Sequence, residues 1–202
     1  MSDAEGREKP ASSSAHSQRV VLTGFMGSGK STVGNILAER LGWSFVDIDQ
    51  RIEAVYSASA SALFQTVGEA EFRKIEAEIM AESLAVPRRV VALGGAAVDL
   101  AENQNFLRHH YSGVIIFLDG EFEVLMDRCL RQEQKATSTY RPLLHQQERA
   151  FARFVSRREW NSAHAHLRID VSCQNCEQCV GEILKYLATL DDGSLVAGDA
   201  WL

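Results

Sequence analysis

The chain has 202 residues, of which 46% are hydrophobic and 24% are charged, and these values are typical of one globular domain with short tails. Its 27 acidic residues outnumber its 21 lysines and arginines, so the formal net charge is −6. This acidic balance argues against nucleic acid or an anionic membrane surface as the partner. An anionic ligand must then be held by a local group of basic side chains.

The ends of the chain and its cysteine content indicate where the protein works. Residues 1–17 are rich in Ser, Ala and charge, and we expect a disordered tail there, then one domain over 18–190 and a second tail over 191–202. The N-terminus lacks an apolar signal segment, and no stretch reaches the roughly 20 apolar residues of a membrane span. Four cysteines are too few for a secreted disulfide scaffold. We therefore expect a protein of the reducing cytoplasm.

Short apolar runs alternate with amphipathic helical patterns through the domain. The runs are nearly continuous and β-branched in places, as in parallel strands that are covered on both faces. The expected strands are 19–24, 44–49, 89–95, 113–119 and 166–170, with helical patterns over 33–41, 72–79, 122–129 and 180–187. This order predicts an open parallel α/β sheet with right-handed crossovers, whose ligand site lies beyond the carboxyl ends of the strands.

A phosphate-binding loop follows the first strand. Residues 24–31, GFMGSGKS, fit the pattern G-x-x-x-x-G-K-[ST] between a strand and a helix, which makes an ordinary glycine-rich turn the weaker reading. Backbone N–H groups of such a loop wrap a phosphate chain, Lys30 reaches the β- and γ-phosphates, and the Ser31 hydroxyl ligates Mg²⁺. The expected nucleotide-binding residues here are Gly27, Ser28, Gly29, Lys30, Ser31 and Thr32.

Two aspartates at the end of the second strand are candidates for the chemistry. Asp47 and Asp49 alternate, so we expect both carboxylates on one side of the strand end. One can hold the hydration shell of Mg²⁺ while the other binds, and deprotonates, an attacking hydroxyl. The alternative is a single aspartate that caps the next helix.

A second group of candidates surrounds Arg73. Glu76 lies three residues later on the same helix, so its carboxylate can orient the guanidinium. The third strand ends in Gly94 and Gly95, and paired glycines there allow a ligand to approach the backbone closely. A solvated surface pair is the competing interpretation of Arg73 and Glu76.

Cys173, Cys176 and Cys179 are spaced by three, a pattern that can ligate zinc or an iron–sulfur cluster. A fourth ligand and a second cysteine pair are missing nearby in the sequence. We therefore favour packing in the first turns of a helix.

The segments GFMGSGKSTVG, FVDID, LFQTVGEAEFRKIE, VVALGG and YRPLL, in this order, resemble the shikimate kinase family from about Arg19 to Leu190. The resemblance implies ATP-dependent phosphorylation of the 3-hydroxyl of shikimate, a step toward chorismate and the aromatic amino acids. It also implies a nucleoside monophosphate kinase-like α/β fold: a five-stranded parallel sheet in the order 2-3-1-4-5, with a lid and a substrate-binding helical subdomain. We expect a monomer that binds ATP, Mg²⁺ and shikimate.

The resemblance also implies residue roles. Asp49 would bind the substrate hydroxyls and act as the base, Asp47 would hold Mg²⁺ through water, and Lys30 and Arg141 would complete the catalytic set. Arg141, the lid arginine, would also bind the nucleotide by closing over its phosphates. Arg73 and Arg157 would bind the shikimate carboxylate. The remaining substrate-site residues would be Phe64 and Phe72 beside the ring, Glu76 behind Arg73, and the backbone of Gly94 and Gly95.

The sequence departs from the family pattern at two places. Ala96 replaces the third glycine after the third strand, which would cost about 1 kcal/mol if the position needs a positive φ. The motif around Arg157 and Arg158 lacks the usual Pro and Tyr, so either arginine could be the ligand. The alternatives are a kinase of another small hydroxy acid, such as gluconate, or an inactive kinase-like nucleotide-binding protein.

Overall fold

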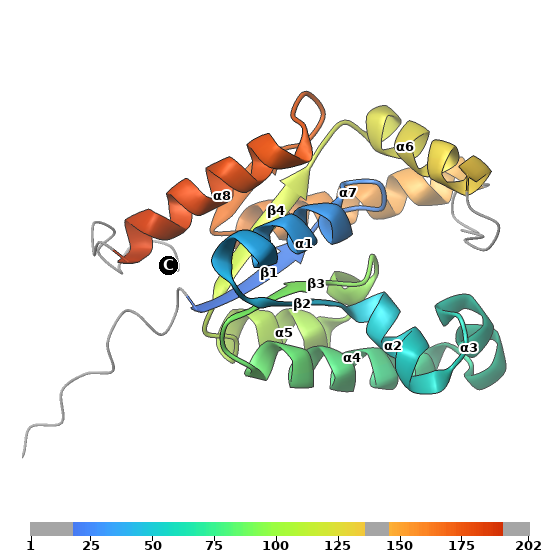
Figure 1. Cartoon of the computed structure of the whole chain (residues 1–202). Helices are drawn as coiled ribbons and strands as arrows, with labels where there is room; N and C mark the ends of the chain where they lie inside the picture. The colour runs from blue at the N-terminus through green and yellow to red at the C-terminus, as the bar shows by residue number, and fades with distance from the viewer. Residues whose placement is uncertain (1–17, 136–145, 192–202) are drawn as a thin grey trace, which may run out of the picture.

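A five-stranded parallel sheet in the order β2-β3-β1-β4-β5 forms the centre of the molecule (Figure 1). The computed structural model describes residues 18–135 and 146–191. The strands are β1 (Arg19–Thr23), β2 (Ser44–Asp47), β3 (Arg89–Ala92), β4 (Val114–Asp119) and β5 (Leu167–Asp170). The expected strand order and parallel pairing are therefore confirmed. β1 and β3 end before the residues expected to carry the chemistry, and β2 ends at Asp47, so Asp49 and the glycines lie in the loops and helix starts that follow.

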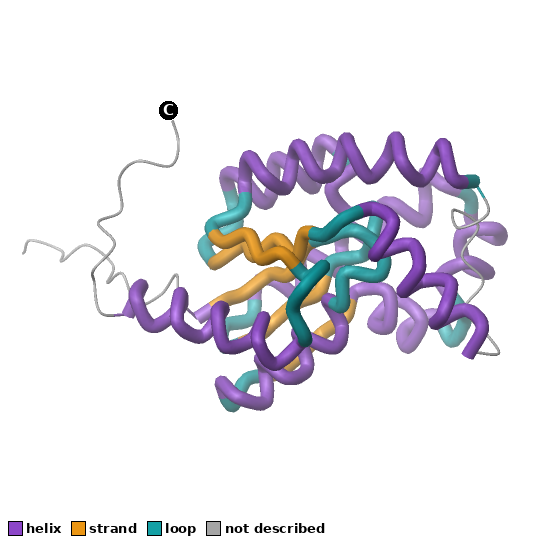
Figure 2. Tube along the Cα trace, turned by 90° about the horizontal axis from the view of Figure 1, so that it is seen from above, coloured by secondary structure: helices purple, strands orange, loops and turns teal. Residues whose placement is uncertain are grey.

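The helices cover both faces of the sheet (Figure 2). They are α1 (Lys30–Leu41), α2 (Ile48–Tyr56), α3 (Ala60–Val67), α4 (Glu69–Ala85), α5 (Ala101–His109), α6 (Phe122–Lys135), α7 (Gln147–His164) and α8 (Cys176–Asp191), with a short 3-10 turn η2 (Ala97–Asp99). Alternation along β1 divides the core, because Val20 and Leu22 pack with α1 and α8 while Val21 packs with α4 and α5. Burial on both faces explains the nearly continuous apolar runs of the sequence.

The topology brings the candidate site together at one edge. β2, β3 and β1 are neighbours, and their carboxyl ends carry Asp47, Gly94 and the phosphate loop, respectively. Segments that are far apart in the sequence thus converge where parallel strands of this fold type bind ligands. None of the helices within residues 18–135 and 146–191 combines the length and apolar character needed to cross a membrane.

Cys176 and Cys179 lie in the first turn of α8 and pack as expected, whereas Cys173 precedes the helix and does not. Cys179 is buried in the core, Cys176 is half-buried against it and Cys173 is exposed. Burial raises the pKa of the Cys179 thiol. In the described part of the chain, no cluster of three or more His, Cys, Asp or Glu side chains could hold a metal ion.

Candidate active site

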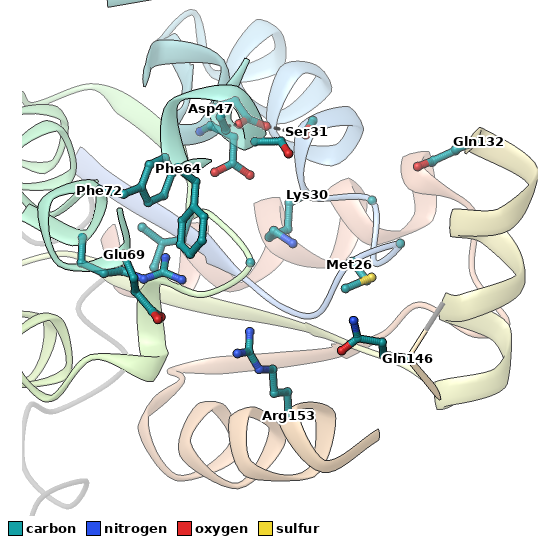
Figure 3. Close-up of a pocket in the computed structure, with 18 of the residues that line it drawn as sticks. Met26, Lys30, Ser31, Asp47, Phe64, Glu69, Phe72, Gln132, Gln146 and Arg153 are labelled. Carbon is teal, nitrogen blue, oxygen red and sulfur yellow. Dashed lines mark hydrogen bonds between the residues drawn. The ribbon is translucent and has the colours of Figure 1, made fainter. Parts of the chain in front are cut away.

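A cavity of about 820 Å³ opens at the carboxyl ends of β1, β2 and β3 (Figure 3). Its walls come from the phosphate loop, the start of α2, the helices α3 and α4, the turn after β3, and α7. Lys30 lies in the middle of this space, and Arg153 reaches into it from α7 on the other side. The volume is within the range of pockets that hold small molecules and cofactors.

The phosphate loop has the backbone that its glycines predict. Gly27 and Gly29 adopt φ values of 78° and 86°, a left-handed region that side chains disfavour, and α1 begins directly after Gly29. Lys30 Nζ donates hydrogen bonds to the carbonyl oxygens of Gly24 at 2.8 Å and Phe25 at 3.1 Å. The ammonium group is therefore held against the loop, at the N-terminus of a helix, where phosphates bind.

Asp47 caps α2, the alternative that the sequence left open, and also contacts the phosphate loop. Its Oδ1 accepts hydrogen bonds from the backbone N–H groups of Asp49 at 3.1 Å and Gln50 at 3.3 Å, which caps α2. Its Oδ2 accepts a 2.5 Å hydrogen bond from the Ser31 hydroxyl. A hydroxyl and a carboxylate thus lie side by side next to the phosphate loop, and both are hard oxygen donors of the kind that Mg²⁺ prefers.

Asp49 does not lie on a strand, so the expected strand alternation of the two carboxylates was wrong. It lies in the first turn of α2, and its side chain lines the cavity. The residue as a whole is exposed at the open side of the cavity, while protein atoms crowd around its carboxyl group. This burial, with the negative charges of Asp47 and Glu76, raises the pKa of Asp49 to about 6, and Lys30 opposes the shift. A carboxyl group with such a pKa is suited to act as a general base near neutral pH.

Because Gly94 has no side chain, two carboxylates can lie close to the backbone of the turn after β3. A Cβ at this position would lie 2.7 Å from Glu76 Oε1 and 2.8 Å from Asp49 Oδ1. Any side chain at residue 94 would displace one or both groups. The sequence predicted that a ligand approaches the backbone closely here. The structure adds that the side chains of Asp49 and Glu76 occupy the space that a side chain at residue 94 would fill.

Arg73 and Glu76 form a buried ion pair within α4, not a solvated surface pair. Arg73 Nη1 lies 2.7 Å from Glu76 Oε2, and the two side chains are 16% and 2% exposed. The guanidinium also lies over the ring of Phe72, 5.6 Å from its centroid, and Phe64 contacts that ring edge-on. Arg73, Phe64 and Phe72 all line the cavity. They form a wall that can bind a ring with an anionic group.

Arg157 and Arg158 occupy different environments. Arg157 is buried behind the cavity wall, with Nη1 3.9 Å from the position of a Cβ at Gly95. Arg158 donates from Nε to Asp119 Oδ2 at 3.0 Å and lies over Phe154. Of the two candidates, Arg157 is the one whose guanidinium faces Gly95, which lines the cavity.

Ala96 does not strain the turn after β3. Its φ is −111° and its ψ is 3°, which any residue adopts. The expectation of an energetic penalty rested on a positive φ, and the structure contradicts that condition.

The sequence reading missed two arginines of α7. Arg149 and Arg153 line the cavity, and with Arg157 they recur every four residues along one side of the helix. That spacing was the available signal. Arg141, the expected lid arginine, lies outside the described residues.

This fold and cavity define a class of protein: a P-loop kinase that phosphorylates a small molecule carrying a negative charge. Comparison with known proteins narrows the class. The family model for shikimate kinase matches residues 26–188, and a shikimate kinase of Symbiobacterium thermophilum is 40% identical over 171 residues, which are 83% of this chain and 95% of that relative. The chain belongs to the shikimate kinase family.

Solved structures agree with this assignment. The structure of shikimate kinase from Acinetobacter baumannii in complex with shikimate has a TM-score of 0.73 and 28% sequence identity, and the match covers 84% of this chain and 92% of that one. A gluconokinase from Sinorhizobium meliloti reaches a TM-score of 0.56 at 22% identity over 87% of this chain and 94% of that one. At that identity the likeness to the gluconokinase concerns the fold alone.

Proposed function

We propose that this chain transfers the γ-phosphoryl group of ATP to the 3-hydroxyl of shikimate. The observation that carries the proposal is that Asp49 and Arg73 line the same cavity beside the phosphate loop, with Arg73 held by its ion pair with Glu76. One group can accept the proton of a hydroxyl, and the other can bind a carboxylate on the same small ring.

The reaction divides among the residues as follows. The loop and Lys30 bind the phosphates of ATP, and Asp49 binds the 3-hydroxyl and accepts its proton as the oxygen attacks the γ-phosphorus. The bond from the γ-phosphorus to the β–γ bridging oxygen breaks, and ADP leaves. Asp49, with a pKa of about 6, is ionised and ready to accept a proton at neutral pH. Arg141 is proposed to close over the phosphates on sequence grounds alone.

Ser31 and Asp47 are the residues that would hold Mg²⁺. Their side-chain oxygens are adjacent, and the described residues hold no group of three or more His, Cys, Asp or Glu side chains that could bind a metal ion, so these oxygens would supplement those of the nucleotide. The ion supplies neutralisation of the phosphate charge when it is bound. The hydrogen bond between Ser31 and Asp47 fixes both side chains at the loop.

Substrate recognition is proposed to depend on Arg73, held by Glu76, and on Arg157 behind Gly95. Phe64 and Phe72 would flank the ring of shikimate, and the backbone of Gly94 and Gly95 would face a hydroxyl. Location in the cytoplasm and the monomeric state stay predictions from the sequence.

Coupled ADP release tests the proposal. The enzyme is assayed with ATP and Mg²⁺ against shikimate, quinate and gluconate, with Asp49→Asn as the matched control. We expect turnover with shikimate and at least a hundredfold loss in the Asp49→Asn variant, within the range that general acid–base groups contribute. Turnover with gluconate and none with shikimate would select the other small-molecule kinase. ATP binding without turnover on any of the three would favour the inactive protein.

A further inference from the structure

Arg157 is held by an acidic residue that no motif of the sequence singled out. Arg157 Nε donates to Asp99 Oδ1 and Nη2 donates to Asp99 Oδ2, both at 2.6 Å. The Arg157 side chain is 4% exposed, whereas that of Asp99 is 32% exposed. Two parallel hydrogen bonds between planar groups fix the orientation of a guanidinium as well as its position.

The pair leaves one terminal nitrogen of the guanidinium beside Gly95, a residue of the cavity wall. Asp99 occupies Nε and one nitrogen of the terminal pair, and the other nitrogen, Nη1, faces Gly95. The ring of Phe25 lies against the guanidinium, with its centroid 5.6 Å from Arg157 Cζ, and blocks movement of the guanidinium in that direction. Gly95 has no side chain to separate Nη1 from the cavity that it lines.

Asp99 belongs to the same turn that forms this wall. It is the last residue of η2, which follows Gly94, Gly95 and Ala96 directly, and the η2 backbone closes with a hydrogen bond from Asp99 N to Ala96 O at 2.9 Å. Asp99, which holds the arginine, and Gly95, which lies beside its Nη1, therefore belong to one compact turn unit. Arg157 reaches this unit from α7, 58 residues away in the sequence.

The arrangement matches that of the other arginine in the site. Arg73 is paired with buried Glu76 and lies over Phe72, as Arg157 is paired with Asp99 and lies over Phe25. Each guanidinium thus has one acid and one aromatic ring behind it. We propose that Asp99 is a positioning residue for substrate binding, which holds Arg157 so that its Nη1 meets the substrate carboxylate at Gly95. This inference rests on the proposed function.

A purely structural role makes a different prediction. A buried arginine needs a counter-charge, so losing Asp99 could only destabilise the fold. A positioning role requires in addition that the binding of a carboxylated substrate weakens while ATP binding and the chemical step persist.

The test uses Asp99→Asn and Asp99→Ala in the full chain, with Glu102→Gln as the matched control. Glu102 is exposed in the first turn of α5, three residues from Asp99, and its substitution removes the same charge. We expect Asp99→Asn to raise the KM for shikimate about tenfold, which corresponds to roughly 1.4 kcal/mol, while kcat and the KM for ATP stay within about twofold. The control should leave all three constants unchanged. Asn keeps the size of Asp99 and one acceptor, so this variant should fold even if Asp99→Ala does not.

Two further measurements test whether the change in KM depends on the substrate carboxylate and on Arg157. The methyl ester of shikimate lacks the carboxylate charge, so its KM should change less than about twofold in Asp99→Asn. In an Arg157→Ala background, Asp99→Asn should have no added effect, because the residue acts through Arg157.

An unchanged or lowered KM for shikimate in Asp99→Asn would overturn the inference, as would an equal rise with the ester. Absence of turnover with shikimate by the unaltered chain would instead refute the proposed function, so the two failures are distinguishable.

Discussion

Replacing Gly94 by alanine should damage the reaction more than the fold. The added methyl carbon would lie 2.7 Å from Glu76 Oε1 and 2.8 Å from Asp49 Oδ1. Carbon–oxygen contacts are comfortable only from about 3.3 Å, so each carboxylate oxygen must retreat by about 0.5 Å. Both oxygens are at the ends of side chains, and Gly94 has no left-handed φ, so the backbone itself accepts alanine.

The size of the effect follows from what the two carboxylates do. A misplacement of about 1 Å in a catalytic group can reduce turnover about a hundredfold, so a 0.5 Å retreat of Asp49 should reduce kcat roughly tenfold. Retreat of Glu76 shifts Arg73 as well, and the KM for shikimate should rise. The KM for ATP should not change, because the phosphate loop is on another strand end.

Steady-state kinetics measures the expected loss of activity in Gly94→Ala, and the midpoint of thermal unfolding measures the expected retention of stability. Ala96→Gly is the matched control, since residue 96 has a φ of −111° and should lose only roughly 0.5–1 kcal/mol of stability, with kcat unchanged. If Gly94→Ala keeps the kcat and KM of the unaltered enzyme, the carboxylates do not depend on the space at Gly94 and the reasoning is refuted.

Three further outcomes follow from the site. Because the raised pKa of Asp49 is about 6 and a base must be ionised, kcat/KM should fall about tenfold per pH unit below pH 6 and level off above about pH 7; a flat profile from pH 5 to 8 would contradict this. Arg73→Lys should raise the KM for shikimate about tenfold with a smaller change in kcat, since a lysine ammonium cannot bind the substrate carboxylate through two parallel hydrogen bonds; an unchanged KM would remove Arg73 from substrate binding. Asp47→Asn keeps the cap of α2, so titration should show a higher Mg²⁺ requirement without a loss of thermal stability; an unchanged requirement would remove Asp47 from the metal site.

The parts of the structure that depend on local sequence were predictable. The phosphate loop has an eight-residue pattern with its own backbone geometry, and the apolar runs fix the strands because both faces of the sheet are buried. Arg73 and Glu76 are three residues apart on one helix, so their pairing followed from helical geometry alone.

Features that depend on tertiary packing were not predictable. Asp49 was expected on a strand because alternation was preferred to the alternative that Asp47 caps the next helix, which starts at Ile48; this error concerned a local choice. The conformation of Ala96 depends on the 3-10 turn after it, and Asp99 meets Arg157 across 58 residues. Pairings of this kind leave no periodic signal in a single sequence.

The position of the transferred phosphoryl group tests the central claim most directly. Shikimate is incubated to completion with the enzyme, ATP and Mg²⁺, and the product is examined by phosphorus–proton correlation NMR. A phosphorus coupled to the proton on carbon 3 is the predicted result, because Asp49 is proposed to activate that hydroxyl. Phosphorylation at another hydroxyl, or unchanged shikimate alongside active turnover of a different hydroxy acid, would contradict it.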